Sequence, residues 1–226
     1  MMCGTLFGVG VGPGDPELLT LKAVRVIQDC PVIAVPGKRK EDTVAFQIVS
    51  QVIPDLGNKE CIELEMPMIK ASDILAQYHQ KGAEQIIECL RMGKNVAFLT
   101  LGDPTIYSTY LYIHSRVTEE GYQTKIVNGI SSFCAAAARL NMGLVEQSEM
   151  LHVVPASYQI EEALKLSGVK VLMKAGKKLS QVKQTLREYN CEAVMIENCG
   201  MENEKVYYGL NEIPDDAGYY SLLIVK

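Results

Sequence analysis

Short apolar runs recur along the first hundred residues, and helical patterns separate them. The runs are partly β-branched and are bounded by glycine or proline, which is typical of buried strands. They cover Leu6–Val11, Val32–Val35, Ile62–Met66 and Val96–Leu101. Strand, helix and strand in succession predict a parallel sheet. We place the start of the first helix near Pro16, because Asp15 is a suitable N-cap and proline suits the first helical turn.

A second series of apolar runs follows a helix expected around Tyr107–Glu120. Strands are expected at Lys125–Val127, Leu151–Val154, Val169–Met173, Ala193–Glu197, Val206–Gly209 and Tyr220–Val225, with helices near Ser132–Asn141 and Lys177–Tyr189. Only a turn-rich link separates the last two strands, which favours an antiparallel or mixed end to this sheet. The sequence therefore predicts two α/β domains, an N-terminal one over residues 1–115 and a C-terminal one over residues 116–226.

Composition and charge narrow the classes of function. The chain has 226 residues, of which 48% are hydrophobic and 22% charged, with a formal net charge of −5. This acidic balance disfavours a nucleic-acid partner, because such surfaces are normally basic. The first residues lack the features of a signal peptide, and no apolar run is long enough for a membrane helix. We therefore expect a cytoplasmic protein that binds neither nucleic acid nor a membrane.

Cysteine and histidine do not form a recognisable metal motif. The seven cysteines include no CxxC pair, and their odd number argues against a closed disulfide framework. The three histidines lie far apart in sequence, without an HxxxH or HExxH pattern. We expect no protein-bound metal.

The first strand runs into a glycine-rich segment, GVGVGPGDPELL. Open α/β sheets place their ligand crevices at such strand ends, and glycines there permit tight turns and close backbone approach. A dinucleotide fingerprint, G-x-G-x-x-G, fails, because the sixth position is Pro13 when counted from Gly8 and Asp15 when counted from Gly10. The segment either binds a ligand or only makes a sharp turn.

A second segment, FLTLGDPTIYSTYLYI, places Gly102 and Asp103 in a turn after a strand. Asp103 suits a helix cap or an acceptor for ligand hydroxyl or amino groups. Tyr107, Tyr110 and Tyr112 are candidates to line a cavity for a planar substrate, although helical spacing predicts that at least one of them belongs to the core.

A third segment, IVNGISSFCAAAARL, leads from a strand through two serines into a helix of small residues. Ser131 or Ser132 is a suitable N-cap. The surrounding sequence lacks the G-x-S-x-G pattern of a serine nucleophile, so nucleophilic catalysis is disfavoured here.

These three segments, in this order and spacing, resemble the tetrapyrrole methylases over nearly the whole chain. The phrases DPTIYSTY, SSFCAAAARL and YYSLLIV further resemble the branch that methylates carbon 20 of precorrin-2 or cobalt-factor II. The resemblance implies the two-domain α/β fold of the class III methyltransferases, with S-adenosylmethionine in the cleft between the domains and the tetrapyrrole in an adjoining trough. It also implies a homodimer.

The resemblance also assigns site residues by position. Those expected to bind the cofactor are Pro13, Gly102, Asp103, Ile106, Tyr107, Ser131, Ser132, Met173 and Cys199. Asp15 and Tyr110 are expected on the substrate side, and the catalytic base stays unassigned. Asn128 stands where the family often has proline, which changes the turn at that point.

The expected function is therefore methyl transfer from S-adenosylmethionine to carbon 20 of precorrin-2 or cobalt-factor II in cobalamin biosynthesis. Alternatives on the same fold are methylases of uroporphyrinogen III, of another precorrin carbon, of a diphthamide precursor or of ribosomal RNA. A nicotinamide-dependent oxidoreductase is disfavoured by the broken glycine fingerprint and by the lack of an acidic residue after the second strand. A ligand-binding module without catalysis remains open.

Overall fold

The fold consists of two compact α/β units. The computed structural model describes residues 3–67, 69, 71–156 and 160–226, apart from the side chain of Lys177. The first unit extends to Ser131, and the second is Ser132–Lys226. The expected boundary near residue 115 is too early, because strand β5 (Gln123–Val127) pairs with β1 (Thr5–Gly10) in the first sheet.

The sheet of the first unit is parallel, as the sequence predicts. Its strand order is β3-β2-β4-β1-β5, and every neighbouring pair is parallel. The remaining strands are β2 (Val32–Pro36), β3 (Glu60–Leu64) and β4 (Val96–Thr100), which confirms the first four expected strands.

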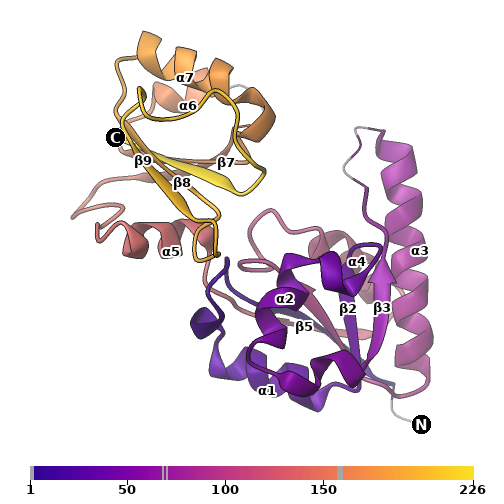
Figure 1. The fold of residues 1–226 in the computed structure, drawn as a ribbon. Coiled ribbons are helices and arrows are strands. Elements are labelled where there is room, and N and C mark those ends of the chain that lie inside the picture. Colours follow the sequence, from indigo (N-terminus) through magenta and orange to yellow (C-terminus); the bar gives the residue numbers. More distant parts are fainter. Residues whose placement is uncertain (1–2, 68, 70, 157–159) are drawn as a thin grey trace. The chain divides into compact units, whose positions relative to one another are not determined.

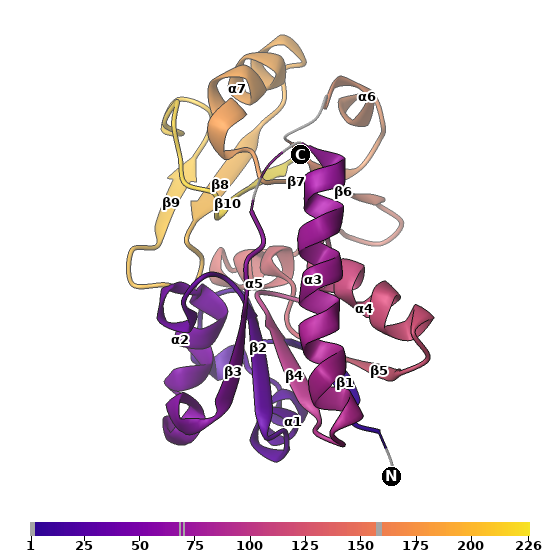
Figure 2. The ribbon, with the colours of Figure 1, turned by 90° about the vertical axis from the view of Figure 1, so that its right-hand side faces the viewer.

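Helices cover both faces of this sheet (Figures 1 and 2). Helices α1 (Leu21–Asp29) and α2 (Val44–Ser50) pack on one face, and α3 (Ser72–Arg91) and α4 (Tyr110–Glu119) pack on the other. Three short 3-10 helices, η1 (Pro16–Leu18), η2 (Lys40–Asp42) and η3 (Pro54–Asn58), lie in the connections. All five residues of β4 are buried, so this central strand separates two apolar cores.

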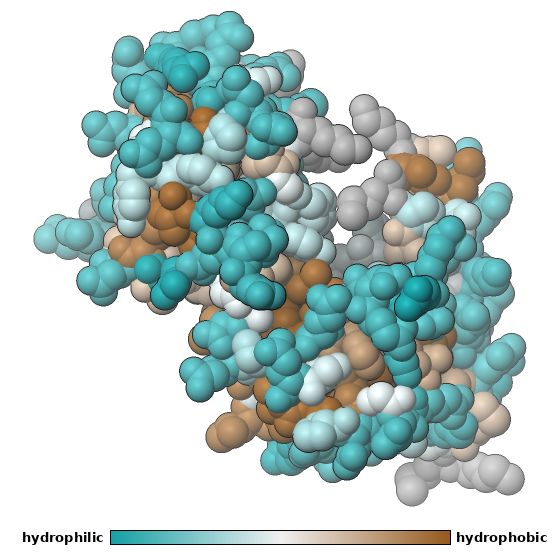
Figure 3. Space-filling model, in the orientation of Figure 1, coloured by the Kyte–Doolittle hydropathy of each residue, from teal (hydrophilic) through white to brown (hydrophobic). Residues whose placement is uncertain are grey.

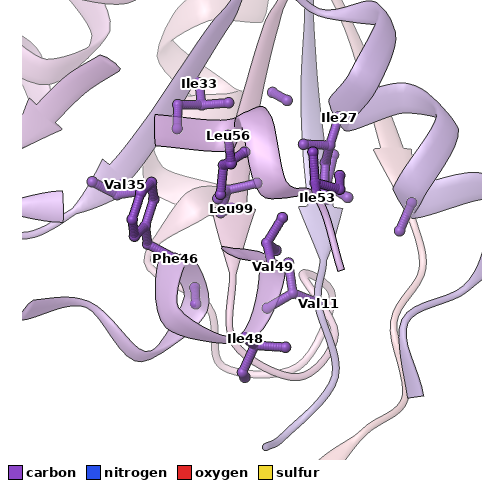
Figure 4. Packing of buried hydrophobic residues seen from close by; sticks show 14 of the residues in the cluster. Val11, Ile27, Ile33, Val35, Phe46, Ile48, Val49, Ile53, Leu56 and Leu99 are labelled. Carbon is purple, nitrogen blue, oxygen red and sulfur yellow. The ribbon is translucent and has the colours of Figure 1, made fainter. Parts of the chain in front are cut away.

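Figure 4 shows the core on the α1 and α2 side. Side chains of the strands, such as Ile33 and Leu99, meet Ile27 of α1 and Val49 of α2. Each side chain of this size contributes about 1.5–3 kcal/mol when it leaves water. This core fixes the strands whose ends carry the glycine-rich loops.

The first helix begins later than expected. Pro16 starts the 3-10 turn η1, and the Asp15 carboxylate caps it by accepting the Glu17 N–H at 2.8 Å. The chain then extends before α1, whose N-cap is Thr20 with its hydroxyl 3.1 Å from the Ala23 nitrogen. The capping role expected for Asp15 is therefore confirmed, but for a short turn and not for the helix.

The second unit has a mixed sheet, as expected. Its strands are β6 (Leu151–Pro155), β7 (Val169–Met173), β8 (Ala193–Glu197), β9 (Lys205–Tyr208) and β10 (Ser221–Val225), in the order β6-β7-β10-β8-β9. Strands β6 and β7 are parallel, and the other pairs are antiparallel. One face packs against α5 (Ser132–Arg139), and the other against α6 (Glu161–Leu164) and α7 (Leu179–Glu188), which follows η4 (Gly176–Lys178).

In the part of the chain that the structure describes, no helix combines the length and apolar character needed to cross a membrane.

A glycine in β1 makes room for a buried aromatic ring. A Cβ added to Gly8 would lie 2.1 Å from a ring carbon of Tyr110. Tyr110 is fully buried, and its ring centroid lies 5.4 Å from that of Phe98. Strand β1 and helix α4 can pack this closely only because residue 8 has no side chain.

We predict that Gly8→Ala lowers the free energy of unfolding by about 1–3 kcal/mol, because the added methyl overpacks the core. Gly57→Ala is the matched control, since a Cβ there meets no atom within 4 Å, and it should change that free energy by less than about 0.5 kcal/mol. Urea denaturation measures both. Equal effects of the two substitutions would contradict the packing described.

Candidate functional site

Three loops leave neighbouring strands at one edge of the first sheet. Strand β1 lies between β4 and β5, and all three are parallel. Their carboxyl ends therefore share an edge, where open α/β sheets bind ligands. The loops begin at Val11, Leu101 and Asn128, so the three segments singled out in the sequence come together here.

The loops meet through glycine backbones. The Gly102 nitrogen donates to the Gly12 carbonyl at 2.8 Å, and the Gly12 nitrogen donates to the Gly102 carbonyl at 3.3 Å. A Cβ on Gly10 would lie 2.5 Å from the Gly129 nitrogen, and one on Gly129 would lie 2.2 Å from the Gly102 oxygen. We call this meeting of Gly10, Gly12, Gly102 and Gly129 the glycine junction. A side chain at Gly10 or Gly129 would force the loops apart.

The carboxylate of Asp103 fastens the loop after β4 to the loop after β5. One oxygen accepts the Thr105 N–H at 2.8 Å and the Thr105 hydroxyl. The other accepts the Gly129 N–H at 3.0 Å and the Asn128 side-chain amide at 3.3 Å. Asp103 is only 7% exposed. Four donors use most of the acceptor capacity of a carboxylate, so the observed role of this side chain is to hold the junction.

The hydrogen bonds also set the ionisation of Asp103. Burial by itself would raise the pKa of this carboxyl, but the bonds from Thr105, Gly129 and Asn128 outweigh burial and hold the pKa below its ordinary value. The group is therefore a carboxylate at neutral pH, and its charge strengthens the hydrogen bonds that join the two loops.

The next residues of this loop are held in an uncommon conformation. The Ile106 N–H donates to the Asp103 carbonyl at 3.2 Å, and the Ile106 side chain is half-buried. Tyr107 follows with a φ of 48° and a side chain that is 47% exposed. Left-handed backbone costs free energy for a residue with a side chain, and such residues cluster at functional sites.

Most of the candidates in the first unit lie at the same sheet edge. Pro13 is buried beside Gly12, whereas Asp15 and Ser131 are half-buried. Ser132, also half-buried, begins α5 and the second unit.

Tyr110 does not fit the substrate role expected of it. Its side chain has no exposed surface and packs in the core between β1, β4, α3 and α4. The hydroxyl lies 3.0 Å from Nδ1 of His114 and 3.4 Å from the Lys125 carbonyl. Burial raises the pKa of this phenol well above its usual range. The expectation was wrong because the ring turns toward the space left by Gly8.

Met173 and Cys199 come together in the second unit. Strands β7 and β8 both run antiparallel to β10, so their carboxyl ends share an edge. Met173 ends β7, Cys199 follows β8, and both half-buried side chains pack against one apolar cluster. Each strand is followed by a left-handed residue, Lys174 (φ 61°) and Asn198 (φ 53°).

The structure adds residues that the sequence did not single out. Asn128 marked only a departure from proline, and Thr105 was not a candidate, yet both donate to Asp103. An Asp followed two residues later by Thr is a signal for such a local turn. In the second unit the Gly218 N–H donates to the Glu197 carboxylate at 2.6 Å, and the Asn198 N–H donates to the Tyr220 carbonyl at 3.1 Å.

Within the described residues, no group of three or more His, Cys, Asp or Glu side chains is placed to hold a metal ion. Cys3, Cys30, Cys61, Cys89, Cys134 and Cys191 are free thiols.

Comparisons with known proteins give a consistent result. The family model described as tetrapyrrole (corrin/porphyrin) methylases matches residues 5–213. A protein of Methanocaldococcus jannaschii named "Probable cobalt-precorrin-2 C(20)-methyltransferase" is 36% identical, with 98% of this chain and 95% of that protein aligned. A "Precorrin-2 C(20)-methyltransferase" of Sinorhizobium sp is 28% identical with the same coverage. A "Uroporphyrinogen-III C-methyltransferase" of Pseudomonas aeruginosa is also 28% identical, with 98% and 90% covered.

Solved structures share the fold. A cobalt precorrin-4 methyltransferase superimposes with a TM-score of 0.78 at 18% identity, covering 98% of this chain and 94% of that one. A uroporphyrin-III C-methyltransferase of Thermus thermophilus, complexed with S-adenosyl homocysteine, gives a TM-score of 0.72 at 18% identity, covering 98% and 97%.

We predict that Asp103→Asn lowers the free energy of unfolding by about 1.5–3 kcal/mol at pH 7, because charged hydrogen bonds are lost and an amide faces N–H donors. The folded-state pKa of Asp103 is lowered, so its contribution is complete above the unfolded value of about 4 and is lost as the pH falls through the folded value.

The difference between wild type and Asp103→Asn should therefore narrow as the pH falls below about 4. Urea denaturation across this pH range measures it. Asp15→Asn serves as the control, because the Asp15 carboxylate accepts the Glu17 N–H in one short turn, whereas Asp103 joins two loops. If the difference in unfolding free energy between wild type and Asp103→Asn stays constant with pH, Asp103 does not act through its charge.

Proposed function

Because the chain belongs to the tetrapyrrole (corrin/porphyrin) methylases, we propose that it transfers a methyl group from S-adenosylmethionine to carbon 20 of a precorrin-2-type tetrapyrrole in cobalamin biosynthesis. The observation that carries this proposal is the 36% identity, over 98% of the chain, with the protein of Methanocaldococcus jannaschii named for that reaction. Two further relatives, named "Precorrin-2 C(20)-methyltransferase" and "Cobalt-precorrin-2 C(20)-methyltransferase", align over 95% and 97% of their own length.

The glycine junction fits a donor of this kind. Gly12 and Gly102 adopt left-handed φ values of 75° and 72°, which glycine does at little cost, and neither residue has a side chain to block a ligand that approaches the backbone. We propose that the donor is held by the residues that the resemblance assigns: Pro13, Gly102, Asp103, Ile106, Tyr107, Ser131, Ser132, Met173 and Cys199. For Asp103 we propose an indirect role, since its carboxylate already holds the two loops.

Methyl transfer of this kind requires the protein mainly to position the two reactants. Bound S-adenosylmethionine supplies a methyl group on a sulfonium, which an electron-rich tetrapyrrole carbon can displace directly. The protein must align the reacting atoms and exclude water around the cation. Loops held by backbone contacts suit this task, and we propose no protein nucleophile. Asp15, half-buried beside the glycine-rich loop, remains our candidate on the substrate side.

The rival with the most support is another methylase of the same fold. The uroporphyrinogen-III methyltransferase is 28% identical over nearly the whole chain. A precorrin-4 C(11)-methyltransferase is 32% identical, but over only 62% of the chain. The 36% identity with the relative named for carbon 20, over nearly the whole length of both chains, favours methylation at carbon 20.

The same comparison favours a substrate that contains cobalt. The relatives named for cobalt-precorrin-2 are 36% and 29% identical, whereas the one named for precorrin-2 is 28% identical. We therefore propose cobalt-factor II or a related cobalt complex as the first acceptor to try, with metal-free precorrin-2 as the alternative.

We predict that the purified protein, incubated anaerobically with labelled S-adenosylmethionine and either acceptor, adds one methyl group at carbon 20. Mass spectrometry counts the added methyl, and NMR locates it. The ratio of kcat/KM for the two acceptors shows whether cobalt is required.

Uroporphyrinogen III in a parallel reaction, and reactions without protein, are the controls. If uroporphyrinogen III is the only acceptor that is methylated, the protein is a uroporphyrinogen III methylase and the carbon-20 assignment is wrong. Binding of both ligands without turnover would indicate a binding module.

We further propose that the protein works as a homodimer in the cytoplasm, as the family resemblance implies. Apolar side chains show in several places on the face of the first unit in Figure 3, and Leu21 of α1 is 91% exposed. A large apolar side chain that stands in water is stabilised when a second subunit covers it. We predict twice the chain mass in sedimentation equilibrium at micromolar concentration; a monomer there would contradict the proposal.

A further inference from the structure

A hydroxyl group beside the glycine junction is buried without a partner. Thr100, the last residue of β4, is 7% exposed, and its Oγ1 has no hydrogen-bond partner among the described residues. Buried side-chain hydroxyls are normally paired, so an unpaired one needs an explanation. Valine has nearly the same shape and would fill this position without the cost of an unpaired polar atom.

The strand register places this hydroxyl next to the junction. Val96 and Phe98 belong to the core on the α3 and α4 side, so Thr100, two residues further on, points to the same face. Its partner across the ladder is Gly10. On that face, the place of a Gly10 side chain is filled by the backbone of Gly102 and Gly129.

Backbone contacts tie the same residue to the loops. The Thr100 carbonyl accepts the Val11 N–H at 2.9 Å. Gly102 follows two residues later, and it exchanges two backbone hydrogen bonds with Gly12. The unpaired oxygen thus lies where the loops after β1, β4 and β5 converge.

We propose that the Thr100 hydroxyl binds a polar group of the methyl donor, an inference that rests on the proposed function. A hydroxyl both donates and accepts, so it can pair with the ribose hydroxyls or the amino-acid end of S-adenosylmethionine. The unpaired hydroxyl lowers the stability of the free protein, and donor binding satisfies it. Because the atom is shielded from solvent in this structure, the bond forms with a small shift of the loops at the junction.

Three variants separate this role from packing. Thr100→Val removes the hydroxyl and keeps the shape, and Thr100→Ser keeps the hydroxyl. Thr185→Val is the matched control: Thr185 is also 7% exposed, but its hydroxyl donates to the Gln181 carbonyl at 3.1 Å in α7. Calorimetric titration with S-adenosylhomocysteine gives the Kd, and thermal unfolding without ligand gives the Tm.

We expect Thr100→Val to raise the Tm by about 2 °C or more and to weaken binding of S-adenosylhomocysteine about tenfold. Thr100→Ser should bind within about threefold of wild type, and Thr185→Val should leave the Kd unchanged without raising the Tm.

An unchanged Kd for Thr100→Val overturns the inference, as does an equal loss in Thr100→Ser, which would indicate a packing role for the methyl group. A lower Tm for Thr100→Val also overturns it, because the hydroxyl would then be bonded in the free protein. If wild type itself fails to bind S-adenosylhomocysteine, the proposed function fails first, and that result is distinct from the others.

Discussion

The candidate site depends on one constraint, the contact of glycine backbones where three parallel strands end. Gly10 and Gly129 leave no room for a side chain between the loops, and Gly102 closes the contact by exchanging hydrogen bonds with Gly12. The buried carboxylate of Asp103 then fastens two of the loops through four donors. The close approach and the hydrogen bonds to this carboxylate together hold the loops after β1, β4 and β5 against one another at the edge of the sheet.

That constraint suits a reaction that needs alignment more than it needs an activated side chain. Direct methyl transfer gains most of its rate from orientation and from excluding water. Loops joined in this way supply the orientation, and the loop after β4 has a left-handed backbone at Tyr107. The second unit repeats this feature at Lys174 and Asn198, directly after two of its strands. The sequence lacks a triad or a metal motif, which agrees with chemistry carried by the donor and the tetrapyrrole.

Sequence patterns predicted the strands well and the side-chain roles less well. Runs of β-branched residues bounded by glycine or proline leave few alternatives to a strand, so the ten strands found in the described residues were all expected. The domain boundary was missed, because the pairing of β5 with β1 is a long-range contact that leaves no local signal. Tyr110 was misassigned, since helical spacing gives the face of a helix but not the gap at Gly8 that receives the ring. Asn128 was noted only as a departure from proline; its bond to Asp103 requires the fold.

We propose that the glycine junction of this methylase forms part of the donor site. Hydrogen exchange followed by mass spectrometry, with and without S-adenosylhomocysteine, can locate the bound donor. We expect slower exchange on binding in the segments around residues 10–12, 100–107 and 128–131, with little change in helices α1 and α3. Protection confined to other segments, with exchange at the junction unchanged, would show that the junction is not part of the donor site.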